Sequence, residues 1–350
     1  MPHATLSRHG VLGIPPLLAL ARERGLDEDE LLRKAGVARA LLDDPHAAVP
    51  VEQVHALVQA LLDRTGDPAL GLDAGRHYHP ATFGLLGAVA AVTPTVREVI
   101  RLFVQYSHLT FTFFLLEFEE NERGGRLVFI EDGDLGPLRR FYLDRELAFV
   151  AETARSFWPE THQEILRSFD FDYPEPAEAA RYRAHFGCTV RFDMPQAAAV
   201  GDFTNDRAAA DTNALGLDVL KEHLQAFAGG QRDGDDVVDR VRREITVAVT
   251  AQRLLPDIDR VGAAVGMSGR ALRRKLSAQA TSFRALTDEV VAALAKRYLR
   301  DSTLTIADVA ERVGYSEAAS FVRAFRRWTG TTPDAFRDPT ARRRPGAWDR

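Results

Sequence analysis

The sequence predicts a mixed α+β N-terminal domain followed by an all-α C-terminal domain, in which two helix-turn-helix units are joined by a linker helix. The chain has 350 residues, which is about twice the length of an average domain. Helical and strand patterns alternate over residues 1–228, whereas the last third of the chain shows helical patterns. That last third also repeats itself, with a constant offset of 48 residues between the two copies.

The Gly/Asp-rich stretch GGQRDGDD, residues 229–236, separates two parts of opposite charge. Residues 1–239 carry 23 Lys and Arg against 38 Asp and Glu, and residues 240–350 carry 22 against 12, which gives net charges of −15 and +10. A basic domain is typical of nucleic-acid binding, because its cations displace the counterions of phosphates. We divide the chain into an N-terminal domain over 1–228, a linker over 229–239, a helical domain over 240–337 and a basic, disordered tail over 338–350.

The spacing of apolar residues predicts three amphipathic helices and two longer strands in the N-terminal domain. The helices cover residues 49–66, 93–110 and 137–158, and the strands cover residues 111–121 and 125–134. Two short strands are expected at Arg191–Asp193 and Ala197–Phe203. This mixture of elements predicts the α+β class for the domain.

The internal repeat aligns residues 257–268 with residues 305–316, and each copy reads as one helix, a tight turn and a second helix. Each copy has an N-cap for the first helix, a glycine that ends it and a serine expected to cap the second helix. In the two copies these residues are Asp257, Gly266 and Ser268, and Thr305, Gly314 and Ser316.

The second helix of each unit has an apolar face and a basic face. The apolar faces consist of Leu272 and Leu276 in the first copy and of Phe321 and Phe325 in the second. The basic faces consist of Arg270, Arg273, Arg274 and Lys275 in the first copy and of Arg323, Arg326 and Arg327 in the second. Such a helix fits the major groove of B-DNA, where an arginine can donate two hydrogen bonds to guanine.

Between the two units, residues 283–299 read as one continuous helix with a regular apolar face. A helix of about 16 residues is ~24 Å long. With the width of the flanking units added, the two second helices are expected to lie about 34 Å apart, which is one turn of DNA. We therefore expect one monomer to contact two successive major-groove segments on the same side of a duplex.

Three segments of the C-terminal domain carry a resemblance to a known family. They are GMSGRALRRKLSAQATSF, ALAKRYL and the 33-residue stretch TIADVAERVGYSEAASFVRAFRRWTGTTPDAFR. On these segments, residues 240–337 resemble the DNA-binding domain of the AraC/XylS family of bacterial transcription regulators. The phrases DPALGLDAG, FGLLGAVAAV and AHFGCTVRFD in the first domain are similar to the arabinose-binding-like domain of one branch of that family.

The resemblance implies roles for residues on both second helices. It assigns the base-reading positions to Arg270, Arg273 and Arg274 in the first copy and to Ala318, Ala319 and Arg323 in the second. Alanine offers only methyl contacts, so readout by Ala318 and Ala319 is expected to be more permissive. We assign the remaining basic residues to phosphate or solvent: Lys275, Arg326 and Arg327.

The N-terminal domain is expected to bind an unknown small-molecule effector, as the family resemblance implies. The candidate polar contacts of a ligand pocket are Tyr106, His108, Thr112, Arg139 and Arg140. A narrow apolar seam just before the linker consists of Leu217, Leu220, Leu224 and Phe227. Such a seam pairs with a second copy of the chain or docks on its own domain, and the resemblance favours a homodimer.

The sequence indicates neither a catalytic site nor a cofactor. Cys188 is the single cysteine, so paired-thiol redox chemistry and a thiolate metal cluster are excluded. His77 and His79 have a spacing that permits metal binding, but no third ligand stands at a recognisable interval, and we assign no metal. No apolar run is long enough to span a membrane, and we expect a cytoplasmic protein without an enzymatic activity.

We therefore expect a transcription regulator, an activator by the family resemblance, with double-stranded DNA, an effector, RNA polymerase and a second copy as its partners. One alternative is a regulator that responds to a protein partner or acts constitutively. A second is an enzyme fused to a DNA-binding module, against which the lone Cys188 argues, since alkyl-transfer repair proteins with a related module need metal-bound cysteines.

Overall fold

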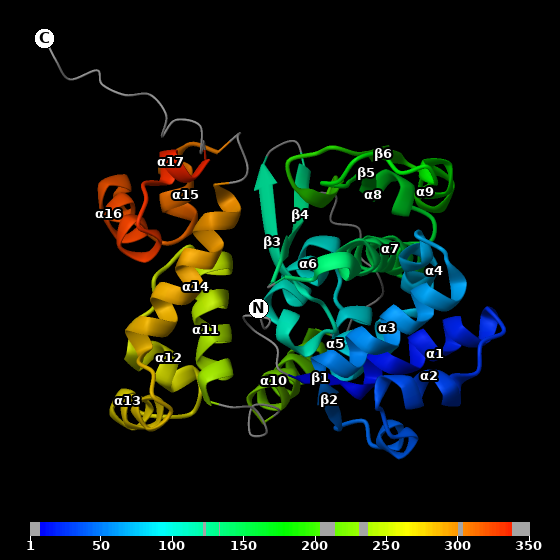
Figure 1. Ribbon diagram of the computed structural model, residues 1–350, viewed down its shortest axis with the longest axis horizontal. Coiled ribbons are helices and arrows are strands. Elements are labelled where there is room, and N and C mark those ends of the chain that lie inside the picture. Colours follow the sequence, from blue (N-terminus) through cyan, green and yellow to red (C-terminus); the bar gives the residue numbers. More distant parts are fainter. Residues whose placement is uncertain are drawn as a thin grey trace, which may run out of the picture. The chain divides into compact units, whose positions relative to one another are not determined.

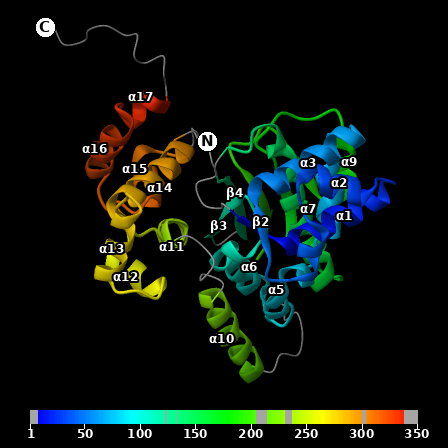
Figure 2. The same ribbon diagram turned by 60° about the horizontal axis from the view of Figure 1, so that its bottom comes forward.

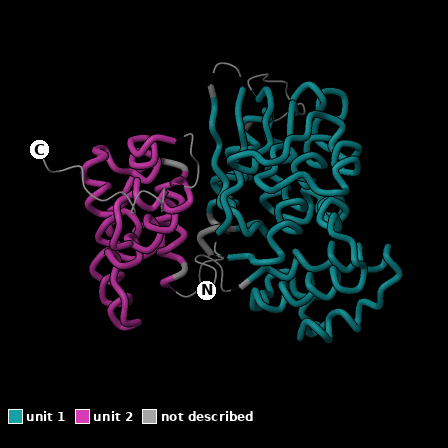
Figure 3. The backbone as a smooth tube through the Cα atoms, turned by 45° about the horizontal axis from the view of Figure 1, so that its top comes forward, with its two compact units in different colours: residues 1–230 teal, residues 231–350 magenta. Residues whose placement is uncertain are grey.

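The computed structural model describes residues 8–121, 124–132, 134–203, 214–230, 237–299 and 304–337. The chain divides into two compact units, residues 1–230 and residues 231–350, which Figure 3 shows in different colours. The first unit contains helices and strands and the second contains helices, so the predicted fold class is confirmed.

The first unit contains ten α-helices and seven strands among its described residues. The helices are α1 (Ile14–Glu23), α2 (Glu28–Ala35), α3 (Val51–Thr65), α4 (Leu70–His77), α5 (Gly84–Ala91), α6 (Val96–Gln105), α7 (Arg139–Phe157), α8 (His162–Ile165), α9 (Ala179–Phe186) and α10 (Ala214–Gly230). The strands are β1 (Arg8–Gly10), β2 (Ala48–Pro50), β3 (Phe114–Asn121), β4 (Gly124–Glu131), β5 (Leu166–Asp170), β6 (Thr189–Arg191) and β7 (Ala197–Gly201).

Five of these strands form one sheet in the order β3-β4-β7-β5-β6. All neighbours are antiparallel except β5 and β6, which are parallel. Leu116 pairs with Phe129, and Leu127 pairs with Ala199. Since side chains alternate across a strand, these residues lie on one face of the sheet. Helix α6 packs against β3 and helix α7 against β5 and β7.

Helix α7 crosses the middle of the first unit, between the sheet and helix α4 (Figure 1). Two glycines of α4 allow a close approach: a Cβ atom on Gly71 would overlap the carbonyl oxygen of Phe141. A Cβ atom on Gly75 would overlap the Cβ of Ala148 in the same way. Larger residues at these positions would separate the two helices.

Because α7 is enclosed, its charged side chains must find partners inside the protein. Asp144 is fully buried and accepts hydrogen bonds from the hydroxyls of Tyr173 and Tyr182. The Nη2 atom of Arg140 donates to the Tyr182 hydroxyl over 3.1 Å. Burial raises the pKa of the Asp144 carboxyl to about 7, even though both tyrosines donate to it.

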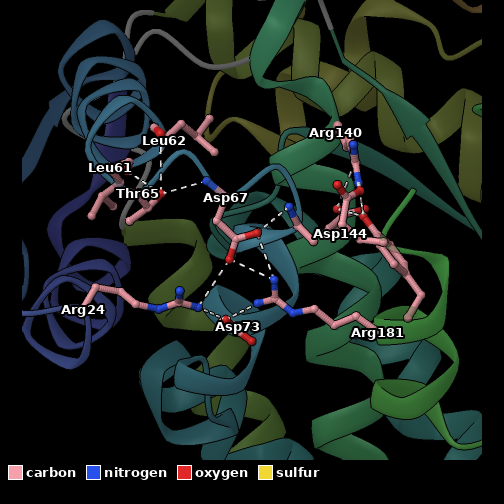
Figure 4. Close-up of polar contacts among 12 residues, drawn as sticks. Arg24, Leu61, Leu62, Thr65, Asp67, Asp73, Arg140, Asp144 and Arg181 are labelled. Atoms are coloured by element: carbon pink, nitrogen blue, oxygen red, sulfur yellow. Dashed lines mark hydrogen bonds and ion pairs between the residues drawn. The ribbon is translucent and has the colours of Figure 1, made fainter. Parts of the chain in front are cut away.

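A second group of charges joins α1, α4 and α9 (Figure 4). Arg181 of α9 donates to both carboxylate oxygens of Asp67 over 2.9 Å and also to Asp73 of α4. Arg24, at the end of α1, binds Asp73 as well. These contacts fix the helical layer on which α7 packs.

The second unit contains seven helices among its described residues: α11 (Val237–Gln252), α12 (Ile258–Ala264), α13 (Gly269–Ala278), α14 (Phe283–Tyr298), α15 (Ile306–Arg312), α16 (Ala318–Thr329) and α17 (Pro333–Arg337). Helices α12 and α13 form the first predicted helix-turn-helix unit, and α15 and α16 form the second. Asp257 Oδ1 accepts from Arg260 N over 2.7 Å, and Thr305 forms a reciprocal capping box with Asp308.

Several details differ from the expectations. Ser316 does not cap α16, because the N-cap is Glu317, whose side chain makes no capping hydrogen bond. Helix α11 begins at Val237, inside the range expected to be a linker. Strand β5 was not predicted, since its five residues alternate too briefly to give a signal. The short strand expected at Arg191–Asp193 is β6, which ends at Arg191.

The raised pKa of Asp144 predicts that this residue makes folding less favourable as the pH rises. The folded state keeps the proton up to about pH 7, whereas an unfolded aspartate releases it near pH 4. Between these values the folded state binds more protons, so the free energy of unfolding falls by at most ~1.4 kcal/mol per pH unit. Asp144→Asn should therefore lose less stability than the wild type between pH 5 and pH 7, measured by urea denaturation. Parallel pH profiles of the two proteins would contradict this role.

Candidate nucleic-acid interface and ligand cavity

Helix α13 presents a basic face because its other face is buried. Ser268 is the N-cap of this helix, and its Oγ accepts a hydrogen bond from Ala271 N over 3.2 Å. Leu272 and Leu276 are fully buried on the other face. All four predicted basic side chains are exposed: Arg270, Arg273, Arg274 and Lys275. Among the described residues none of these four has an ion-pair or hydrogen-bond partner within the chain. Their charges are therefore available to an external anion.

Helix α16 is built in the same way on two buried phenylalanines, Phe321 and Phe325. On its exposed side, Arg323 Nη2 donates to Ser320 Oγ over 3.0 Å. Arg327 forms an ion pair of 3.1 Å with Asp288 of α14 and lies over the ring of Trp328.

The other residues of α16 that the sequence assigns to DNA are two alanines and an arginine. Arg326 is exposed and has no partner among the described residues. Ala319 is exposed, and Ala318 is half-buried. The second helix thus offers fewer unpaired cations than α13 does.

The two basic helices lie at opposite ends of the second unit, and α14 runs between them, as Figures 1 and 2 show. Helix α14 has 16 residues, which corresponds to ~24 Å of length. Its apolar face is buried, including Leu286, Val290 and Leu294. Helix α14 packs on α16, and α11 packs on both α14 and α13, so these helices connect the two basic helices within one unit.

Gly314 follows the first helix of the second helix-turn-helix unit and lies close to the backbone of residues 254–255. Gly314 has φ +84°, and a Cβ atom there would lie 2.7 Å from Leu255 N and 3.0 Å from Leu254 C. Both the backbone conformation and the space therefore require glycine.

The first unit contains a cavity of about 80 Å³ between the sheet and helices α6 and α7. It is partly open, and almost all of its wall is apolar. The sheet contributes Leu116, Leu127, Phe129 and Ala199, α6 contributes Val96, Val99, Ile100 and Phe103, and α7 contributes Glu146, Phe149, Val150, Thr153 and Ala154. Trp158, directly after α7, also lines the cavity.

The cavity contains few polar groups, and most of them are engaged. Glu146 forms an ion pair with Arg145, which is itself buried. Thr110 donates to the carbonyl oxygen of Ser107 over 2.6 Å. Thr112 Oγ1 accepts from Phe114 N over 3.1 Å. These partners leave little hydrogen-bonding capacity for a polar ligand.

Of the five residues proposed for a ligand pocket, Thr112 lines this cavity. Tyr106 is buried but is not part of the cavity wall, and the His108 side chain lies outside the described residues. Arg139 pairs with Glu131 and Asp172, and Arg140 belongs to the group around Asp144. Sequence reasoning missed the stripe on α7 at Glu146, Phe149, Val150 and Thr153, although its helical spacing was visible.

The apolar seam of α10 lies against its own unit. Leu217 and Leu224 are buried in the core of the first unit, and Leu220 is half-buried against that core. Helix α10 packs on α5, which is the docking alternative that the sequence left open. The side chain of Phe227 lies outside the described residues.

The described part of the chain contains neither a metal-binding group nor a membrane-spanning helix. No group of three or more His, Cys, Asp or Glu side chains there is arranged to hold a metal ion. No helix there is long and apolar enough to cross a membrane.

Comparison with known proteins relates both units to transcription regulators. A model of the arabinose-binding domain of AraC transcription regulators, their N-terminal domain, matches residues 25–204, and a model of a helix-turn-helix domain matches residues 261–339. The chain is 26% identical to the ornithine utilization regulator of Pseudomonas aeruginosa over 323 residues, 92% of this chain and 94% of that protein.

Two other matches are partial or distant. The transcriptional activator NphR of a Rhodococcus species is 33% identical over 124 residues, 35% of this chain and 36% of that protein. The solved structure of the transcriptional regulator CdpR from Pseudomonas aeruginosa has a TM-score of 0.48 and 20% identity, and the match covers 93% of this chain and 98% of that one.

The close approach at Gly314 predicts a larger loss of stability than a left-handed conformation alone would cause. Gly314→Ala must accept both φ +84° and the contact with residues 254–255, whereas Gly330, with φ +75°, has open space around its Cα. Gly330→Ala should lower the free energy of unfolding by about 1–2 kcal/mol and Gly314→Ala by more. Thermal denaturation of the three proteins measures this difference, and equal losses would show that the contact relaxes freely.

Proposed function

Because the chain belongs to the AraC family of transcription regulators, we propose that it activates transcription when a small-molecule effector occupies the cavity of its first unit. The observation that carries the proposal is the pair of basic helices, α13 and α16, held by one spacer helix. Four unpaired cations on α13 and the exposed Arg323 and Arg326 on α16 supply the charge that DNA attracts.

On DNA, α13 and α16 enter two successive segments of the major groove. Arg270, Arg273 and Arg274 contact base edges from α13, and Arg323 does so from α16, with methyl contacts from Ala318 and Ala319. Lys275 and Arg326 contact phosphates. Arg327 supports the position of α16 through its ion pair with Asp288 and contributes less to DNA.

Effector control acts by a shift of population. A molecule bound in the cavity favours one arrangement of the regulator over another, and the favoured arrangement has a different affinity for DNA. Activation requires that the bound form also contacts RNA polymerase. The name of the Pseudomonas aeruginosa relative makes L-ornithine one molecule to test as effector.

We also infer that two copies of the chain pair. Leu217 and Leu224 are already buried within their own unit, so the available part of α10 is its exposed side, where Val219 is 45% exposed. Sedimentation equilibrium of the wild type and of Val219→Lys would test this pairing, with weaker association expected for the variant because a charge enters an apolar contact. Identical association would exclude this face of α10.

The assignment of α16 predicts a selective effect of Arg323→Ala. On a duplex selected by the wild-type protein, this variant should bind about 5- to 150-fold more weakly, because a bidentate base contact supplies ~1–3 kcal/mol of discrimination. Arg284→Ala is the matched control, since Arg284 is an exposed arginine of the same unit on α14. It should weaken binding to selected and unrelated duplexes equally.

Fluorescence anisotropy over a range of salt concentrations measures both affinities. Unchanged binding of the selected duplex by Arg323→Ala would remove α16 from the reading of sequence.

Effector control has its own test. A molecule that binds the folded protein must raise its melting temperature, and by reciprocity an effector must also change the affinity for DNA. Ligands from a metabolite screen should therefore shift both quantities. A regulator that responds to a protein partner, or acts constitutively, would show no such ligand.

A further inference from the structure

Two residues at the C-terminal end of α7, Thr153 and Trp158, line the cavity. Thr153 is 8% exposed and Trp158 is 6% exposed, and within the described part of the chain neither Thr153 Oγ1 nor Trp158 Nε1 has a hydrogen-bond partner. Unsatisfied buried polar groups are unfavourable and call for an explanation. The indole N–H can only donate, so its missing partner is an acceptor.

The cavity offers no charge to a ligand. Among the described residues that line it, Glu146 is the single ionisable side chain, and its charge is balanced by Arg145. Arg145 is engaged in turn, since Nη2 also donates to Phe111 O over 2.7 Å and the guanidinium lies 5.0 Å from the ring centroid of Tyr142. A charged ligand would therefore be buried without a counter-charge, which is costly.

The dimensions of the cavity suit a small ligand. Its volume of about 80 Å³ is several times the ~10–15 Å³ that one water molecule needs, so the cavity admits a small organic molecule. Along α7 the wall extends from Glu146 to Ala154, which is ~12 Å at the rise of an α-helix. A sugar or an amino acid of this size would leave most of its polar groups unpaired against the apolar wall.

We propose that the effector is an uncharged, largely apolar small molecule with one hydrogen-bond acceptor, and that this acceptor binds the indole N–H of Trp158. The proposal rests on the proposed function, because it names the chemical class of the effector. Trp158 acts as the specificity-determining residue, and the apolar wall supplies most of the affinity.

Two probes of the same ring size separate the acceptor contact from apolar burial. Cyclohexanone carries an acceptor oxygen, and methylenecyclohexane carries a CH₂ group in its place. In thermal-shift titrations of the full-length protein both should raise the melting temperature, and cyclohexanone should bind about 2- to 10-fold more tightly.

Three variants define the contact. Trp158→Phe keeps an aromatic ring but loses the N–H. It should therefore weaken the binding of cyclohexanone about 2- to 10-fold and leave the binding of methylenecyclohexane unchanged. Trp328→Phe is the matched control, since Trp328 lies on α16 in the other unit and its Nε1 is also unpartnered. This variant should change the binding of neither probe. Ala154→Leu places extra atoms in the cavity and should weaken both probes.

L-arabinose and L-ornithine serve as polar comparison probes. If either of them stabilises the protein and cyclohexanone does not, the apolar class is wrong while control by a small molecule stands. If Trp158→Phe weakens both ring probes equally, the acceptor contact is wrong. If no probe binds and the metabolite screen also finds no ligand, the proposed effector control itself fails.

Discussion

Helix α7 runs through the interior of the first unit, and the ionisable side chains that it buries need partners there. Asp144 is met by two tyrosine hydroxyls, and Arg145 is met by Glu146 and a backbone carbonyl. The helix can occupy this position because two glycines of α4 let it approach closely. The arrangement of the surrounding helices and of the sheet depends on this buried, electrically balanced element.

The same constraint decides the chemistry of the cavity. The polar groups of α7 are engaged with α9 and the adjoining loops, and the stripe that faces the sheet is mostly apolar. Near its C-terminal end, Thr153 Oγ1 and Trp158 Nε1 have no hydrogen-bond partner among the residues that the structure describes. The cavity combines an apolar wall with a few polar side chains, which is the usual composition of a site for a small molecule.

In the second unit, the two helix-turn-helix units share one packing pattern but differ in how their arginines are paired. Both second helices are held by two buried apolar residues, but the cations of α13 have no partners among the described residues, whereas Arg327 of α16 is bound to Asp288. The two helices therefore differ in how much charge they can offer to DNA. Helix α13 presents arginines, whereas α16 begins with the small side chains of Ala318 and Ala319.

Short-range signals in the sequence were sufficient to predict the two helix-turn-helix units. N-caps at Asp257 and Thr305, the left-handed Gly314 and the apolar spacing of the helices predicted both helix-turn-helix units, because these signals act within a few residues. The prediction that Ser316 caps the second helix was wrong. The second copy has one additional residue at this point, and Glu317 occupies the N-cap.

The tertiary structure decided which partners each buried or charged group meets. Periodicity indicated that Leu217 and Leu224 are covered, but only the fold placed them against α5. Arg139 and Arg140 were available to a ligand in the sequence, and the fold engages them with carboxylates and a tyrosine hydroxyl far along the chain. A helical period fixes which face of an element is buried, whereas its partner depends on long-range packing that no local pattern records.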